Sequence, residues 1–334
     1  MDYKRTYILD LASRMGDKEG QELVMSAISA PQFTDETAAI AHLEASRWAD
    51  GVNCPHCGSV NVHRMAGKTQ AGYFQCNDCR DKFTCRTGTV MERSHIPVHK
   101  WLLAIHLISS AKNGMSAHEL HRLLGITYKS AWFLAHRIRE AMDETKSKTP
   151  PKPVGGEGSS IQADETYYLN TSKRAKGYKK GTPKAAVVAL VEKPSGRVRA
   201  KHIVHGVSAV DVREFLVANA DRKSELHTDE SALYNRVGKE FAAHKAVYHG
   251  SRPGPHYVGK DGETTNAVEN FFGVFKRGMR GTYTFCGEQH LQRYLNEFSF
   301  RYSNRSGLGI NDTARAALIL KGAEGKRLTF RRPN

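Results

Sequence analysis

The sequence has no long apolar run and no export signal that we can recognise. Its longest uninterrupted apolar stretch, Ala185 to Val191, is too short to cross a bilayer. Near the start, Asp2 and Asp10 flank and interrupt the apolar residues Tyr7 to Leu9, which is unlike the apolar region of a secretion signal. We therefore expect a cytoplasmic protein that has no membrane partner.

Acidic residues are scarce beside basic ones. The chain has 50 Lys and Arg residues against 34 Asp and Glu residues, and its formal net charge is +16 at pH 7. Such an excess favours a polyanionic partner, because neutralising phosphates releases counterions and drives association. We therefore expect nucleic acid as the partner, and association with the nucleoid.

Cysteine is also rare, but four of the six cysteines form two close pairs. Two residues separate Cys54 from Cys57 and Cys76 from Cys79, and eighteen residues lie between the pairs. This spacing is typical of a zinc ribbon, in which four thiolates hold one zinc ion, and it favours zinc over disulfides in the cytoplasm. The aromatic residues that we expect in the small core of the ribbon are Tyr73, Phe74 and Phe83.

Two predicted helices beyond the ribbon are separated by a glycine. They span Ala117–Leu124 and Tyr128–Met142, and Gly125 breaks the chain between them. The arrangement is typical of a helix-turn-helix segment, in which Arg137 and Arg139 on the second helix are candidate DNA contacts. The alternative is an ordinary helical hairpin that belongs to a core.

A linker rich in proline, glycine and serine follows at residues 146–160 and separates two folding units. Beyond it, three predicted strands are followed by a helix and a fourth strand, which is the order of an RNase H-like core. The predicted elements are the strands Ile161–Leu169, Ala185–Glu192 and Arg197–Val204, the helix Ser208–Ala220 and the strand Leu226–Thr228.

Two aspartates belong to predicted strands of this core. Asp164 lies within the first strand and Asp229 directly follows the fourth. Carboxylates in strands are costly unless a cation satisfies them. The first and fourth strands of an RNase H-like sheet are neighbours, so we expect Asp164 and Asp229 to face each other across a metal-sized gap. Glu165 and Glu230 point to the opposite face if the strands are regular.

A third acid, Glu269, lies on an amphipathic helix, opposite its apolar face. Lys276 follows it two turns later. Three oxygen ligands can hold two divalent ions about 4 Å apart for phosphoryl transfer. Asn266, one turn before Glu269, is an alternative third ligand, although an anionic oxygen holds Mg²⁺ better than an amide does.

Two basic segments would lie beside these acids. A charge run is often only a solvated loop, but here we expect phosphate contacts. The predicted DNA-binding residues are Lys173, Arg174, Lys176, Lys179 and Lys180 in the loop between the first two strands, and Lys276, Arg277 and Arg280 after Glu269.

Taken together, these motifs resemble the bacterial insertion-sequence transposases of the ISXO type, which have an N-terminal zinc ribbon and a DDE-type catalytic core. The resemblance covers most of the chain from about residue 35 to residue 305. The motifs are Arg47-Trp48 and the four paired cysteines, Phe74, Phe83 with Thr87 to Thr89, Asp164 to Thr166, Thr228 to Glu230, Thr265-Asn266 with Glu269 to Phe271, Lys276 to Gly278, Gly281 to Tyr283, His290-Leu291, Tyr294, Glu297-Phe298, Phe300 to Tyr302 and Arg305.

The resemblance implies DNA transposition, with Asp164, Asp229 and Glu269 as the ligands of catalytic Mg²⁺ or Mn²⁺. Such a protein binds the ends of its element as a homo-oligomer on double-stranded DNA, cleaves DNA with metal-activated water, and joins the freed 3′-hydroxyl to target DNA. Two alternatives remain. One is a zinc-ribbon and helix-turn-helix regulator without catalysis, and the other is an RNase H-like, structure-selective nuclease that cleaves but does not join.

The predicted fold class is therefore α+β or α/β and multidomain. The expected parts are an N-terminal helical segment at 1–50, a zinc ribbon at 51–92, a helix-turn-helix-like DNA-binding segment at 93–145, the linker at 146–160, an RNase H-like mixed-sheet core at 161–305, and a basic C-terminal tail at 306–334, which we expect to be frayed from Lys321 to Asn334.

Overall fold

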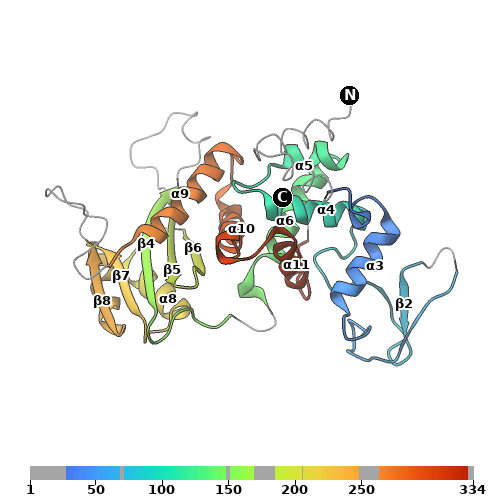
Figure 1. The fold of residues 1–334 in the computed structure, drawn as a ribbon, viewed down its shortest axis with the longest axis horizontal. Coiled ribbons are helices and arrows are strands. Elements are labelled where there is room, and N and C mark those ends of the chain that lie inside the picture. Colours follow the sequence, from blue (N-terminus) through green and yellow to red (C-terminus); the bar gives the residue numbers. More distant parts are fainter. Residues whose placement is uncertain are drawn as a thin grey trace. The chain divides into compact units, whose positions relative to one another are not determined.

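The computed structural model describes residues 28–67, 71–147, 151–168, 185–204, 206–247 and 263–329. The chain divides into two compact units (Figure 1). The first unit comprises residues 1–111, 115–148 and 312–334, and the second comprises residues 112–114 and 149–311. Among the described residues, none of the helices has the length and apolar character that a membrane span requires.

The first unit contains a small three-stranded antiparallel sheet in the order β1-β2-β3. Phe74 stacks on Phe83 with ring centroids 5.5 Å apart, and the edge of Trp48 packs on both rings. Tyr73 is 42% exposed, so the expectation that it belongs to this core is wrong. Successive residues of a strand face opposite sides, and Phe74 takes the inner side. The elements are η1 (Pro31–Phe33), α3 (Glu36–Arg47), β1 (Val62–Arg64), β2 (Tyr73–Cys76) and β3 (Lys82–Thr84).

Helices form the rest of the first unit. Ser116 and Glu119 make a reciprocal capping box at the start of α5, and Gly125 ends that helix in the left-handed region at φ 58°. Thr127 then accepts a hydrogen bond from the backbone N–H of Ser130 and caps α6. The two predicted helices and the glycine between them are therefore confirmed. The elements are α4 (Val98–Ser110), α5 (Ala117–Leu124), α6 (Tyr128–Ala141), η3 (Glu144–Lys146) and α11 (Asp312–Gly322).

Arg137 and Arg139 are not surface residues of α6, because they are 7% and 2% exposed. The Arg137 guanidinium donates to the backbone carbonyl of Glu92 at 2.5 Å and lies over the rings of Trp101 and Phe133. The C-terminal half of α6 is buried on all sides, from Leu134 to Ala141, so both arginines are covered although they point in opposite directions. The structure therefore contradicts their assignment as DNA contacts.

The C-terminal segment differs from the frayed tail that we expected. Lys326 is 6% exposed, and its ammonium group donates to the backbone carbonyls of Ala141 (3.0 Å) and Asp143 (2.6 Å). The backbone N–H of Val90 donates to the carbonyl of Ala323. These hydrogen bonds hold the segment after α11 against the first unit as far as its described residues extend.

The second unit contains a five-stranded mixed sheet in the order β6-β5-β4-β7-β8. Strands β4, β5 and β6 are antiparallel neighbours, whereas β4, β7 and β8 run parallel. The four predicted strands and the helix are confirmed, and β8 is a fifth strand that we did not predict. The elements are β4 (Ser160–Tyr168), β5 (Ala185–Lys193), β6 (Val198–Ile203), α8 (Ala209–Asn219), β7 (Glu225–Asp229), η4 (Ala232–Tyr234), η5 (Val237–Glu240), β8 (Ala243–Val247), α9 (Asn266–Gly281), η6 (Glu288–His290), α10 (Leu291–Ser303) and η7 (Ser306–Leu308).

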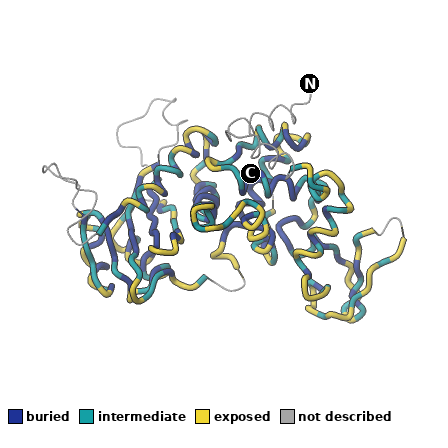
Figure 2. The backbone as a smooth tube through the Cα atoms, in the orientation of Figure 1, coloured by how far each residue is buried: buried dark blue, intermediate teal, exposed yellow. Residues whose placement is uncertain are grey.

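Helices cover both faces of this sheet (Figure 1). One face packs against α9 and α10 through a cluster that includes Phe271, Phe275 and Phe298. The other packs against α8 through a cluster that includes Phe215 and Leu216. The interior strand β5 is accordingly buried along almost its whole length (Figure 2). Its nearly continuous apolar sequence is what a strand covered on both faces requires.

The linker is shorter than residues 146–160. The backbone N–H of Val154 donates to the carbonyl of Asn219, and the N–H of Asp221 donates to the carbonyl of Val154, each at 2.8 Å. Val154 is also part of the core cluster beside α8. The boundary between the units falls between residues 148 and 149, so the end of the predicted linker belongs to the second unit.

Candidate active site

Asp164 and Asp229 lie on neighbouring parallel strands at matching positions. Gln162 pairs with His227 in the register of β4 and β7, and the two aspartates follow two residues later on each strand. Burial, and then the negative charge of Asp229, raise the pKa of Asp164 to about 7. The two carboxylates therefore share one electrostatic environment, as the strand order predicted.

Backbone N–H groups at the start of α9 donate hydrogen bonds to side chains of both strands. The backbone N–H of Ala267 donates to the side-chain oxygen of Gln162 at 2.8 Å, and the N–H of Thr264 donates to Nδ1 of His227 at 3.4 Å. Gln162 and His227 point to the same face as the aspartates, because residues two apart on a strand share a face. The sequence did not indicate these anchors, since their partners are far away in the chain.

Glu269 lies in the first turn of α9. Thr265 donates its hydroxyl hydrogen to Oε1 of Glu269 at 2.7 Å. The charge of Glu269 also contributes to the raised pKa of Asp164. Asn266 is exposed at the first position of the helix. The electrostatic coupling thus favours Glu269 as the third acid, and its role as a ligand stays a prediction.

Lys276 lies two turns beyond Glu269. Partial burial and the charge of Arg280 lower the pKa of Lys276, while the charge of Asp164 opposes this effect. The ammonium group is therefore within electrostatic reach of the acids. Arg277 and Arg280 are exposed on the same helix. The predicted basic residues Lys173, Arg174, Lys176, Lys179 and Lys180 lie outside the described residues.

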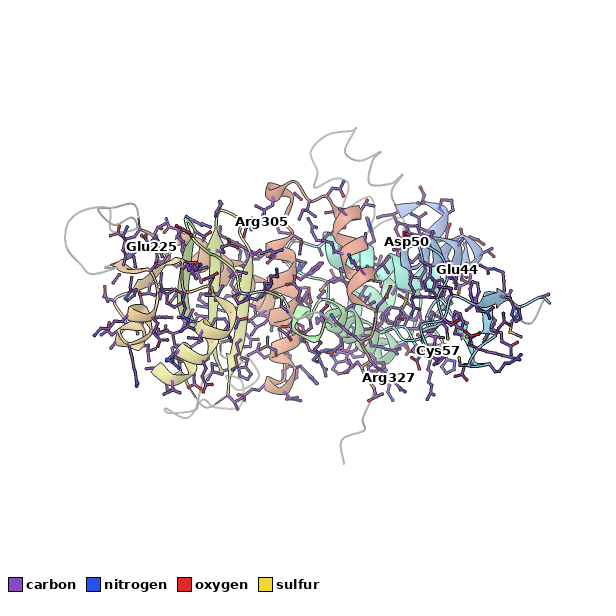
Figure 3. All side chains as sticks on the ribbon, turned by 90° about the horizontal axis from the view of Figure 1, so that it is seen from below. Glu44, Asp50, Cys57, Glu225, Arg305 and Arg327 are labelled. Carbon is purple, nitrogen blue, oxygen red and sulfur yellow. The ribbon has the colours of Figure 1, made fainter. Side chains whose placement is uncertain are left out.

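Glu165 lies on the opposite face of β4, as alternation along the strand predicted. It accepts a hydrogen bond of 2.7 Å from the hydroxyl group of the buried Tyr234, which belongs to the cluster on the α8 side. His227 is also engaged, because its Nε2 pairs with Glu225 (labelled in Figure 3). Neither Glu165 nor His227 has the position of a third metal ligand.

The four paired cysteines lie together in the first unit. Their sulfur atoms are all within 4.8 Å of one another, with 3.7 Å between Cys54 and Cys79 and 3.6 Å between Cys57 (labelled in Figure 3) and Cys76. A tetrahedral zinc site with bonds of about 2.3 Å needs sulfurs about 3.8 Å apart. A zinc ligand must be a thiolate, and four cysteines can supply four of them to one ion. The cluster therefore fits one zinc ion.

The carboxylates form a more open group than the cysteines. Among the described residues, the four cysteines are the one group of potential ligands whose atoms all lie within 4.8 Å of one another. Asp164, Asp229 and Glu269 offer hard oxygen ligands of the kind that Mg²⁺ prefers. The donor set thus fits divalent ions that are shared among the acids and a bound substrate.

The two units thus combine a four-cysteine cluster with a five-stranded mixed sheet that carries acids on two adjacent strands. Residues 34–82 match the transposase zinc-ribbon domain, and residues 155–303 match the ISXO2-like transposase domain. Both matches agree with the resemblance found in the motifs of the chain.

Comparison with known proteins gives one curated relative and distant solved structures. An uncharacterized protein in the transposable element ISH50 of Halobacterium salinarum is 26% identical over 287 residues, which cover 80% of this chain and 91% of that protein. A chain of the simian T-cell lymphotropic virus intasome, solved with a PP2A regulatory subunit, is 15% identical with a TM-score of 0.28, covering 54% of this chain and 63% of that one. The HTLV-2 integrase catalytic core, solved with magnesium, is 12% identical with a TM-score of 0.26. The match covers 45% of this chain and 86% of the integrase chain.

Proposed function

We propose that this protein is a DDE-type DNA transposase that cleaves the ends of its element and joins the freed 3′-hydroxyl to target DNA. The observation that supports the proposal is the electrostatic coupling of three acids from separate elements. Asp164 and Asp229 lie at matching positions of adjacent strands, and the charge of Glu269 on α9 contributes to the raised pKa of Asp164. The net charge of +16 suits a double-stranded DNA substrate.

The proposed chemistry divides between the metal ions and the chain. Mg²⁺ or Mn²⁺ supplies activation of the attacking oxygen and stabilisation of the leaving oxygen. The chain holds the ions through its three carboxylates and positions the scissile phosphate. Lys276 donates to a phosphate oxygen near the acids, and Arg280, one turn further on, neutralises the next phosphate.

The helix-turn-helix segment is the proposed reader of the element end. In such segments the N-terminal residues of the second helix contact base edges. Tyr128 and Lys129 occupy these positions on α6 and are exposed, and Arg122 is exposed near the end of α5. These three residues replace the buried Arg137 and Arg139 as candidate contacts. We also propose that the protein acts on DNA as a homo-oligomer, because both ends of an element must be brought together.

Variants of the acids test this proposal. Asp164→Asn and Asp229→Asn abolish cleavage and joining of a labelled duplex copied from the DNA that flanks the gene, because a neutral amide holds Mg²⁺ poorly. Glu269→Gln lowers cleavage and joining nearly as much, and Asn266→Ala lowers them less. Binding of the duplex without divalent ions is unchanged in all four variants.

The outcomes separate the alternatives. An active Glu269→Gln together with an inactive Asn266→Ala makes Asn266 the third ligand. Full activity in all four variants rules out the proposed site. A wild-type protein that binds the duplex but never cleaves it is a regulator, and one that cleaves without joining is a nuclease.

A further inference from the structure

Gly273 lies in the middle of α9, where glycine is unfavourable. In a helix interior it is less favourable than alanine by about 1 kcal/mol. A Cβ atom built at Gly273 meets no atom of the described part of the chain within 4 Å. By contrast, a Cβ at Gly278 of the same helix would lie 2.3 Å from the ring of Phe298. Packing therefore explains the glycine at 278 and leaves the one at 273 unexplained.

The position of Gly273 on α9 connects it to the candidate active site. With about 100° per residue, Lys276, Glu269, Arg280 and Gly273 fall within an arc of about 60°. The apolar residues Phe271, Phe272 and Phe275 fall outside this arc and are buried. Gly273 is thus a bare patch of helix backbone between Glu269 and the two cations.

We propose that Gly273 is the point at which the DNA strand being cleaved crosses α9. The absence of a side chain lets the sugar-phosphate backbone approach the helix closely. A strand in contact with Gly273 presents one phosphate to Asp164, Asp229 and Glu269 and the following phosphates to Lys276 and Arg280. Gly273 is then a positioning residue. This inference rests on the proposed function.

A substitution that stabilises the fold and weakens the reaction tests the inference. Gly273→Ala raises the melting temperature, because the helix gains a better helix former. We expect it to slow cleavage of the labelled end duplex about tenfold or more, because small displacements of a substrate are costly to catalysis. Gly273→Leu abolishes cleavage. Gly307→Ala is the matched control, since Gly307 also has open space around its Cβ position and lies outside the proposed DNA path.

Cross-linking gives a readout that does not depend on activity. The duplex carries a tether on the phosphate next to the cleavage site that ends in a mixed disulfide with a small thiol. Without divalent ions, the thiolate of Gly273→Cys attacks this disulfide, forms a disulfide with the tether and releases the small thiol. Gly307→Cys does not, and the wild-type protein measures the background from native cysteines.

The results distinguish failure of the inference from failure of the proposed function. The inference is overturned if Gly273→Ala cleaves the duplex at the wild-type rate, or if no cross-link forms at position 273. Neither result affects the proposed function. A lower melting temperature of Gly273→Ala also overturns it, because packing would then require the glycine. If the wild-type protein neither binds nor cleaves the duplex, both proposals fall.

Discussion

At the scale of single residues, Asp164 carries its charge at a cost when no divalent ion is bound. Burial in β4 and the neighbouring charge of Asp229 raise its pKa to about 7, from an ordinary value of about 3.9. The folded protein therefore holds the proton on Asp164 more tightly than the unfolded chain does. A cation at the site removes this cost, because a nearby positive charge favours the ionised form of the carboxyl group.

The direction of the pH effect follows from linkage. Below about pH 4 the carboxyl group is protonated in both states, and its contribution to stability is fully present. As the pH rises from about 4 to 7 the unfolded chain loses this proton first, so the contribution is lost. In protein dialysed free of Mg²⁺, we expect Asp164→Asn to raise the free energy of unfolding by about 1 to 3 kcal/mol at pH 8.

Urea denaturation at pH 4 and pH 8 checks this prediction. The variant and the wild type have similar stability at pH 4. Added Mg²⁺ stabilises the wild type at pH 8 and leaves Asp164→Asn unchanged. A variant that is less stable than the wild type at pH 8 would contradict the assignment of a costly charge.

At the scale of elements, the zinc ribbon is too small to be held by its apolar core alone. Three aromatic rings and three short strands bury little surface, so the metal supplies much of the folding energy. We expect one zinc ion per chain by elemental analysis. Cys76→Ser loses the metal and unfolds the ribbon, whereas Cys85→Ser keeps it, because Cys85 is buried outside the ligand group. Equal zinc content in the two variants contradicts the site.

The helix α6 has two ends with different roles. Lys129 lies in its exposed first turn, whereas Arg137 is buried and hydrogen-bonded to the carbonyl of Glu92. We expect Lys129→Ala to weaken binding of the end duplex by about 1 to 3 kcal/mol without changing the melting temperature. Arg137→Ala lowers the free energy of unfolding by about 1 to 3 kcal/mol, because a buried carbonyl loses its partner.

Fluorescence anisotropy with the duplex and thermal denaturation separate the two effects. The prediction fails if Lys129→Ala binds the duplex like the wild type. It also fails if Arg137→Ala leaves stability unchanged and weakens binding alone.

At the scale of the whole molecule, the excess of positive charge makes DNA binding dependent on salt. Each phosphate that the protein neutralises adds a slope of about −0.9 to log K against log salt concentration. Neutralising Lys173, Arg174, Lys176, Lys179 and Lys180 makes this slope less negative by about 0.9 for each phosphate that the loop no longer binds. The acid variants of the active site keep the wild-type slope.

A double variant, Lys223→Ala with Lys239→Ala, controls for the loss of lysines elsewhere on the second unit. Lys223 precedes the start of β7 and Lys239 precedes the start of the parallel strand β8. Asp229 lies at the other, C-terminal end of β7. We expect this control to leave the slope nearly unchanged. An unchanged slope in the loop variant means that the loop is only solvated.

The sequence by itself determined the features that depend on neighbours in the chain. Local signals include the spacing of the cysteines, the glycine at position 125 and the alternating or apolar patterns of the strands. From these signals the ribbon, α5, α6 and four of the five strands in the sheet of the second unit could be predicted. The motifs also indicated the two regions that match transposase family models. Strand β8 escaped because His244 and Lys245 interrupt its apolar pattern.

Only the tertiary structure decided which faces of these elements are covered. The burial of Arg137 depends on the packing of α6, and that of Lys326 on carbonyls more than 180 residues away in the chain. The hydrogen bond from Ala267 to Gln162 likewise joins residues 105 positions apart. A sequence pattern gives the period of a helix or strand but not the partner that it meets, because interaction energies depend on distance in space and not along the chain.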